Sequence, residues 1–175
     1  MSIDFFTVST LTGRVLFIFV ALAHHRRRIV HFNITEHPTA TWAAQQIIEA
    51  CPDDSAPRWL LRDRDAIYGE AFRRRVAGMG IGEVISCPAS PWQNAYAERF
   101  VRTIKESCLD RMILIGQASL RRAIREFEAH YHLERNHQGL QNQLIMHPTP
   151  QRRDGSIACR ERLGGLLKYY HRPAA

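Results

Sequence analysis

Three acidic residues stand where a carboxylate could do chemistry. Asp4 interrupts an apolar, strand-like segment at residues 3–8. Asp63 follows a second such segment at residues 58–62, and Glu98 lies near the start of a helical pattern. Hard divalent cations such as Mg²⁺ prefer oxygen ligands, and two such ions about 4 Å apart stabilise phosphoryl transfer. Three acids on separate elements therefore suit a metal site at a phosphodiester, provided that folding brings them together.

Each acid alone has an ordinary structural explanation. A carboxylate among apolar residues, as at Asp4, costs several kcal/mol unless it is paired or bound to a metal, and a structural ion pair would suffice. Asp63 and Asp65 lie just past a strand, where acids commonly cap turns. Glu98 alone is typical of a solvated helix surface. Only the order and spacing of the set favour a shared site.

A mixed sheet with helices packed on it would position these residues. Alternating or continuous apolar runs predict strands at residues 3–8, 14–23, 29–33, 58–62 and 83–86. Apolar spacings of three and four residues, with capping signals, predict helices at residues 39 or 41 to 50, 72–79, 92–109 and 118–132. The order β-β-β-α-β-α-β-α predicts an α/β fold with a mixed five-stranded sheet. We expect residues 1–150 to form the core and 151–175 a C-terminal tail, either an arm used in assembly or a hairpin packed on its own core.

Composition favours one class of partner and argues against several kinds of site. The formal net charge is +7, from 24 Lys and Arg against 17 Asp and Glu, which favours a polyanionic partner. The cysteines form no Cys-x-x-Cys pair, so neither a disulfide framework nor a zinc site is supported. The apolar run at residues 15–23 is too short to span a bilayer as a helix and does not resemble a signal peptide. We expect a cytoplasmic protein with no membrane contact.

Several segments resemble the catalytic core of bacterial insertion-sequence transposases, which belong with retroviral integrases to the DDE group and its ribonuclease H-like fold. The segments are Ile3–Phe6, Arg62–Gly69, Ser90–Phe100, Lys105–Asp110 and Arg135–Leu140. Together they extend over most of the chain. The 34 residues enclosed by Asp63 and Glu98 (residues 64–97) are close to the family's interval between its second acid and its glutamate.

The resemblance also favours Asp63 over Asp65 as the second acid. In the family an aromatic residue follows that acid by five positions, and Tyr68 stands five positions after Asp63. Asp65 would lose this match and shorten the interval to Glu98. Asp65 nevertheless stays open as the alternative.

What the resemblance implies is a transposase core that performs metal-dependent DNA cleavage and strand transfer. Asp4, Asp63 and Glu98 would bind two Mg²⁺ ions, with Mn²⁺ as a substitute. Water would cut a strand at an element end, and the freed 3′-hydroxyl would attack target DNA with no covalent protein–DNA intermediate. The partners would be element ends and target DNA, in the nucleoid, and a homodimer or larger assembly because two ends must be joined.

Three further residues near Glu98 are candidates for DNA contact. Arg102 and Lys105 lie four and seven residues after Glu98 and share its helix face, and related integrases use the equivalent positions to contact donor DNA ends. Asn94, one turn before Glu98, is predicted to orient the metal shell or DNA. The triplets Arg26–Arg28 and Arg73–Arg75 are interpreted as solvated faces, with non-specific phosphate contact as the alternative.

The chain departs from the family's pattern at its start. Met1 lies three residues before Asp4, so the first strand is clipped and the family's helical DNA-binding region is missing. We therefore expect a fragment, one subunit of a split enzyme with a separate DNA-binding subunit, or a decayed reading frame. Two alternative functions follow: a catalytically inactive DNA-binding remnant that regulates a full transposase, and a ribonuclease H-type nuclease.

Overall fold

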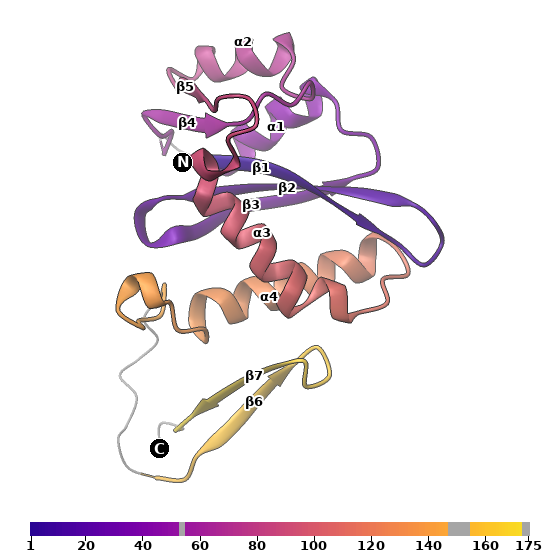
Figure 1. Ribbon diagram of the computed structural model, residues 1–175, viewed down its shortest axis with the longest axis vertical. Helices are drawn as coiled ribbons and strands as arrows, with labels where there is room; N and C mark the ends of the chain where they lie inside the picture. The colour runs from indigo at the N-terminus through magenta and orange to yellow at the C-terminus, as the bar shows by residue number, and fades with distance from the viewer. Residues whose placement is uncertain (53–54, 147–154, 173–175) are drawn as a thin grey trace.

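One mixed sheet organises the molecule (Figure 1). The computed structural model describes residues 1–52, 55–146 and 155–172. The strands are β1 (Ser2–Ser9), β2 (Val15–Ala23), β3 (Arg28–Thr35), β4 (Trp59–Arg62) and β5 (Gly82–Ile85), in the spatial order β3-β2-β1-β4-β5. The first three strands form an antiparallel meander, whereas β4 runs parallel to β1 and β5 runs parallel to β4. The predicted mixed five-stranded α/β sheet is confirmed.

Helices cover both faces of the sheet, so it carries two apolar cores. On one face, α1 (Ala40–Ala50) and α2 (Glu70–Gly78) bury residues such as Ile47 and Phe72 against Phe19. On the other, α3 (Ala95–Ser107) and α4 (Gln117–Leu133) bury residues such as Ile104 and Phe127 against Ile18. Neighbouring residues Ile18 and Phe19 enter opposite cores because successive side chains of a strand point to opposite faces.

The helix boundaries follow local chemistry. α1 begins after Thr39, whose hydroxyl accepts a hydrogen bond from the Trp42 N–H at 3.1 Å, one of the two capping residues that the sequence offered. The prediction of one helix from Trp92 was wrong at its start. Residues Pro91–Asn94 form a 3-10 turn instead, and the backbone of Asn94 (φ −105°, ψ 38°) is not α-helical, so α3 begins at Ala95.

The C-terminal segment is a hairpin of β6 (Ala158–Arg162) and β7 (Leu167–His171). Leu167 is buried in the core formed by α3 and α4, and Arg162 makes ion pairs with Glu126 of α4 and with Glu134, the residue that follows α4. The structure therefore shows the tail as a hairpin packed on its own core. The predicted boundary between residues 150 and 151 lies outside the described residues.

In the described part of the chain, no helix is long and apolar enough to cross a bilayer.

Candidate active site

Asp4 lies in the central strand on the face that α3 covers. Its neighbours Ile3 and Phe5 pack on the α1 side, and Phe6 packs on the side of α3 and α4. Because side chains alternate along a strand, Asp4 shares the face of Phe6. One carboxylate oxygen accepts a hydrogen bond from the Phe5 N–H at 2.9 Å. The sheet therefore directs this half-buried acid toward α3.

Two contacts hold α3 over this part of β1. The side-chain amide of Asn94 donates to the carbonyl oxygen of Ile3 at 3.0 Å, and the Lys105 ammonium lies 5.7 Å from the ring centroid of Phe6. On the helix these contacts lie before and after Glu98, and on the strand they lie before and after Asp4. Glu98 is therefore held above the stretch of β1 that carries Asp4.

The register between parallel strands brings the second acid to the same place. Ser2 of β1 pairs with Leu61 of β4, so Asp4 and Asp63, each two residues further on, continue side by side from paired positions. The turn after β4 is fixed by its own carboxylates. Asp63 accepts from the Asp65 N–H at 3.1 Å, and Asp65 accepts from the Ile67 N–H at 2.9 Å.

The pKa of Asp4 reflects both its burial and the neighbouring acids. The pKa of Asp4 is raised to about 7, chiefly by burial, because a charged carboxylate loses its hydration there. Repulsion by Asp63 is the second largest cause of this shift, the hydrogen bond from Phe5 opposes it, and Glu98 and Asp65 add smaller repulsions. Asp63 thus has the largest effect of the three acids and Asp65 the smallest, which supports the choice of Asp63 without excluding Asp65.

An open cavity of about 340 Å³ connects the acids. Its walls include Asp63, Asp65 and Glu98, together with the loop of residues 86–90 that follows β5. Arg64 ties this loop to the acids, since its Nε donates to the Ser86 carbonyl at 3.1 Å. The structure therefore gathers predicted acids from the β4–α2 turn and α3 at one surface, beside Asp4.

The acids suit a hard divalent cation, because they offer carboxylate oxygens, although the thiol of Cys87 also lines the cavity. The buried Oδ1 of Asn94, which has no hydrogen-bond partner, is a further oxygen at the foot of α3. Within residues 1–52, 55–146 and 155–172, however, no three His, Cys, Asp or Glu side chains lie in positions that could hold a metal ion together. The chemistry fits a cation, and the acids would have to move closer to share one.

Two residues that position the turn after β4 were not identified as such from the sequence. Arg62 is only 4% exposed and pairs with Glu83 at 2.5 Å, while its Nη1 donates to the Asp63 carbonyl at 2.8 Å. It also lies over the ring of Tyr68, 5.2 Å from the centroid. Burial raises the pKa of Tyr68 well above its ordinary value, as do Asp4, Asp63 and Asp65. An arginine in an otherwise apolar strand was the available signal.

The predicted DNA-contacting residues have different settings. Arg102 is exposed and Lys105 is partly buried on α3. Asn94 is only 5% exposed, and its amide joins α3 to β1, so a positioning role follows from its contacts. Contact of these three residues with DNA stays a prediction. The interpretation of Arg26–Arg28 as a solvated face was wrong for Arg26, whose guanidinium donates to the carbonyls of Leu144 and Ile145.

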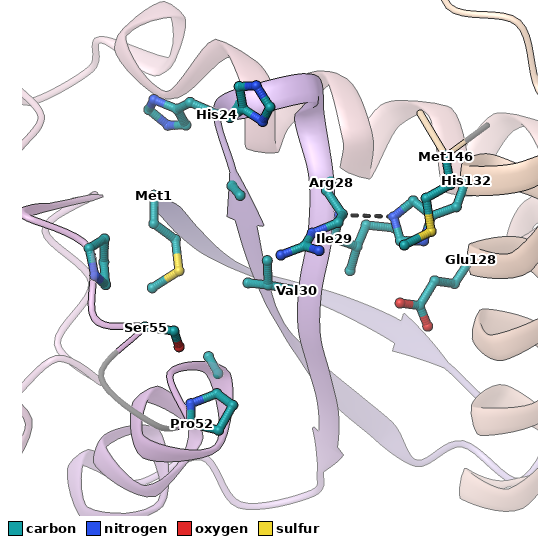
Figure 2. Close-up of a pocket in the computed structure, with 14 residues that line it drawn as sticks. Met1, His24, Arg28, Ile29, Val30, Pro52, Ser55, Glu128, His132 and Met146 are labelled. Atoms are coloured by element: carbon teal, nitrogen blue, oxygen red, sulfur yellow. Dashed lines mark hydrogen bonds between the residues drawn. The ribbon is translucent and has the colours of Figure 1, made fainter. Parts of the chain in front are cut away.

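A larger cavity of about 660 Å³ lies away from the predicted acids, beside β3 and α4 (Figure 2). Arg28, Glu128 and His132 are among its lining residues. The Ile29 N–H donates to Nε2 of His132 at 3.0 Å, and burial, with Arg28 and His137, lowers the pKa of His132 to about 4. His132 is therefore a neutral acceptor that holds β3 to α4.

Comparison with known proteins supports the resemblance. Residues 79–144, which include Glu98 and all of α3 and α4, match the family model described as the integrase core domain. The match extends over less than half of the chain. The sequence matches no curated protein.

Solved structures show the fold. A chain of the simian T-cell lymphotropic virus intasome is similar with a TM-score of 0.64 and 13% identity, over 98% of this chain and 66% of that one. The HTLV-2 integrase catalytic core domain in complex with magnesium, in a trimeric form, has a TM-score of 0.56 and 9% identity, over 82% and 90%. The catalytic core domain of BIV integrase has a TM-score of 0.56 and 15% identity, over 79% and 87%.

These findings confirm a ribonuclease H-like fold of the integrase-core type, as the resemblance implied. The intasome chain is longer, since this chain spans just under two thirds of it. At these identities the structural likeness establishes the fold. The activity has to be argued from the residues.

Proposed function

We propose that this chain is the catalytic core of a DDE-type transposase or integrase that cuts DNA strands and joins them to new sites with the help of divalent metal ions. The observation that carries the proposal is the arrangement of Asp4, Asp63 and Glu98. They come from β1, the turn after β4 and α3, and they repel one another across one open surface of an integrase-type fold.

In this proposal Asp4, Asp63 and Glu98 hold two Mg²⁺ ions, or Mn²⁺ in their place. When bound, the ions activate the attacking oxygen and stabilise the leaving oxygen at the phosphodiester. The protein's own contribution is placement. Asn94 fixes the start of α3 on β1, and Arg62 fixes the backbone at Asp63. Arg102 and Lys105, further along α3 on the face of Glu98, contact the phosphates of the DNA end.

The partners follow from the reaction. DNA supplies both the element end and the target, and the positive net charge of +7 favours its approach. Two ends have to be joined together, so the working form is a homodimer or larger assembly in the cytoplasm.

The test is a strand-transfer assay with Glu98→Gln. A labelled duplex oligonucleotide with a free 3′-hydroxyl is incubated with supercoiled plasmid and Mn²⁺. The wild-type protein should join the two, and Glu98→Gln should abolish joining while leaving the melting temperature unchanged. Glu106→Gln, an exposed glutamate on the same helix, is the matched control and should be active. Full activity of Glu98→Gln would contradict the proposal.

The same assay separates the alternatives. A ribonuclease H-type nuclease would cut a labelled RNA–DNA hybrid and join nothing. An inactive regulator would bind the duplex equally well with EDTA and with Glu98→Gln, and neither Mg²⁺ nor Mn²⁺ would produce joined product.

A further inference from the structure

Three arginines from distant parts of the chain meet on one side of the molecule. Arg27 lies in the turn between β2 and β3, Arg99 on α3, and Arg135 just after α4. Arg27 lies over the ring of Tyr96 and Arg135 bonds to Ser107, and on α3 these two residues share a side with Arg99. In agreement with this placement, all three arginines oppose the rise in the pKa of Tyr131 that burial causes. Arg27 and Arg135 act in the same way on His137. Figure 1 shows the β2–β3 turn and the segment after α4 at the same end of the sheet.

Nothing acidic neutralises this cluster in the part of the chain that the structure describes. The ion pairs found there involve other arginines, namely Arg14, Arg62, Arg74, Arg160 and Arg162. Arg27 instead lies 5.4 Å from the ring centroid of Tyr96, and Arg135 donates to the Ser107 hydroxyl at 3.4 Å. Neutral groups therefore hold Arg27 and Arg135, while Arg99 is exposed on α3.

The backbone at Arg27 is strained in a way that places its side chain. Arg26 and Arg27 have φ values of 56° and 57°, a left-handed conformation that side chains larger than glycine rarely adopt. Such strain persists where surrounding contacts hold it, and it concentrates at functional sites. Arg26 provides those contacts through its bonds to the carbonyls of Ile145 and Leu144, at 2.8 and 2.7 Å.

Gly139 makes room for the same side chain. A Cβ at this position would overlap the guanidinium group of Arg27. The segment after α4 thus packs against the guanidinium group of Arg27, and a side chain at residue 139 would require that group to shift. The strained turn and this contact are separate features of the position of Arg27, which also lies over the ring of Tyr96.

The cluster lies on another face of α3 from Glu98, because residues one or two positions apart on a helix point in different directions. We propose that Arg27, Arg99 and Arg135 form a phosphate-binding cluster that takes a stretch of DNA backbone outside the acidic surface. The planar fork of arginine suits phosphate oxygens. The inference rests on the proposed function and adds to it a second DNA contact, separate from Arg102 and Lys105.

Binding without catalysis tests the cluster. Anisotropy of a labelled DNA duplex is measured in EDTA over a series of salt concentrations for Arg27→Gln, Arg99→Gln and Arg135→Gln. Each phosphate contact contributes about 0.9 to the slope of log K against log[salt]. Each variant should therefore make the slope less steep by about 0.9, and the triple variant by about 2.7. Arg73→Gln, an exposed arginine on α2 across the sheet, is the matched control and should keep the wild-type slope.

Gly139→Ala tests placement without removing a charge. The new methyl group should displace the Arg27 guanidinium and weaken DNA binding toward the level of Arg27→Gln, with an unchanged melting temperature. Because Arg99 makes no side-chain bond in the described structure, Arg99→Gln should also fold normally. A wild-type slope for Arg99→Gln together with wild-type affinity for Gly139→Ala would overturn the cluster.

Two further outcomes keep the proposals distinct. Inorganic phosphate at matched ionic strength should not displace the duplex more than chloride does, and selective displacement would reassign the cluster to a small phosphate ligand. If the arginine variants lower the slope while the wild-type protein joins no DNA, the cluster stands and the proposed function fails. If joining occurs and all slopes equal the wild-type value, the cluster fails alone.

Discussion

At the scale of single residues, Asp4 places a carboxylate where its charged form is unfavourable. It occupies the central strand of the sheet, where burial and the repulsion of Asp63 and Glu98 raise its pKa to about 7. Nothing in the described structure offers it a cationic partner at ion-pair distance, and its recorded hydrogen bond is to the adjacent Phe5 N–H. The position disfavours the charged form of Asp4, and a cation bound beside the carboxylate would offset that cost.

The pH dependence of stability should reveal this cost. The pKa of Asp4 rises from 3.8 in the unfolded chain to about 7 in the folded protein, so the folded state binds the proton more tightly. Its contribution to stability is then present below pH 4 and is lost as the pH rises toward 7, by up to about 4 kcal/mol. In EDTA, Asp4→Asn should match wild type at pH 4 and exceed it at pH 8 in chemical denaturation.

The exposed acid Asp110 provides the control for that measurement. Asp110→Asn should follow the wild-type pH profile throughout. Superimposable profiles for Asp4→Asn and wild type would show that Asp4 carries no such strain.

At the scale of elements, an ion-pair network around one buried glutamate attaches the β6–β7 hairpin to the end of α4. Glu134, whose side chain is 1% exposed, pairs with Arg162 at 2.7 Å, with Arg160 at 3.4 Å and with His130 at 3.1 Å. Burial alone would raise the pKa of Glu134, but the hydrogen bonds from Arg162 and His130 lower it to about 2. The network and the buried Leu167 together fix β6 and β7 on the core.

Removing this charge should loosen the hairpin. Glu134→Gln leaves Arg162 without its buried partner, and we expect a loss of about 2–3 kcal/mol, less than for a fully buried pair because Arg162 is partly exposed. Amide hydrogen exchange should quicken in β6 and β7 before the rest of the protein. Since the folded pKa is depressed, the difference from wild type should shrink as the pH falls from 4.5 toward 2.

An exposed pair in the same hairpin gives the comparison. Glu161 and Lys168 lie 3.2 Å apart with side chains 52% and 49% exposed. Glu161→Gln should change stability by less than about 0.5 kcal/mol. Equal effects of the two substitutions would mean that the network does not hold the hairpin.

At the scale of the whole molecule, the candidate site exists only because three separated elements converge. β1, the β4–α2 turn and α3 each contribute one of Asp4, Asp63 and Glu98. A cation shared by these side chains would bind the folded chain and not the unfolded one. Metal binding should therefore stabilise the global fold, and this can be measured without any DNA.

Mg²⁺ or Mn²⁺ should raise the melting temperature relative to NaCl of equal ionic strength. A ligand at one hundred times its dissociation constant stabilises the folded state by about 2.7 kcal/mol. Asp63→Asn and Glu98→Gln should abolish this shift, and Asp65→Asn should keep it. A shift that survives Asp63→Asn and disappears in Asp65→Asn would identify Asp65 as the second acid.

The sequence by itself determined the elements and the candidate acids. Alternating or continuous apolar residues marked the strands, as at Ile18 and Phe19, and the resemblance to the DDE group, with the interval between Asp63 and Glu98, indicated the class of site. These features are local, because a strand's alternation and a helix's capping at Thr39 depend on residues a few positions apart. A predicted helix boundary was wrong where another local structure formed, as in the 3-10 turn at Pro91–Asn94.

Only the tertiary structure decided which residues share a surface. The parallel pairing of Ser2 with Leu61 places Asp63 beside Asp4, and the bond from Asn94 to Ile3 joins residues 91 positions apart. The meeting of Arg27, Arg99 and Arg135 around Tyr131 is of the same kind. Such contacts depend on how strands and helices dock after they form, and no periodicity along the chain records that docking.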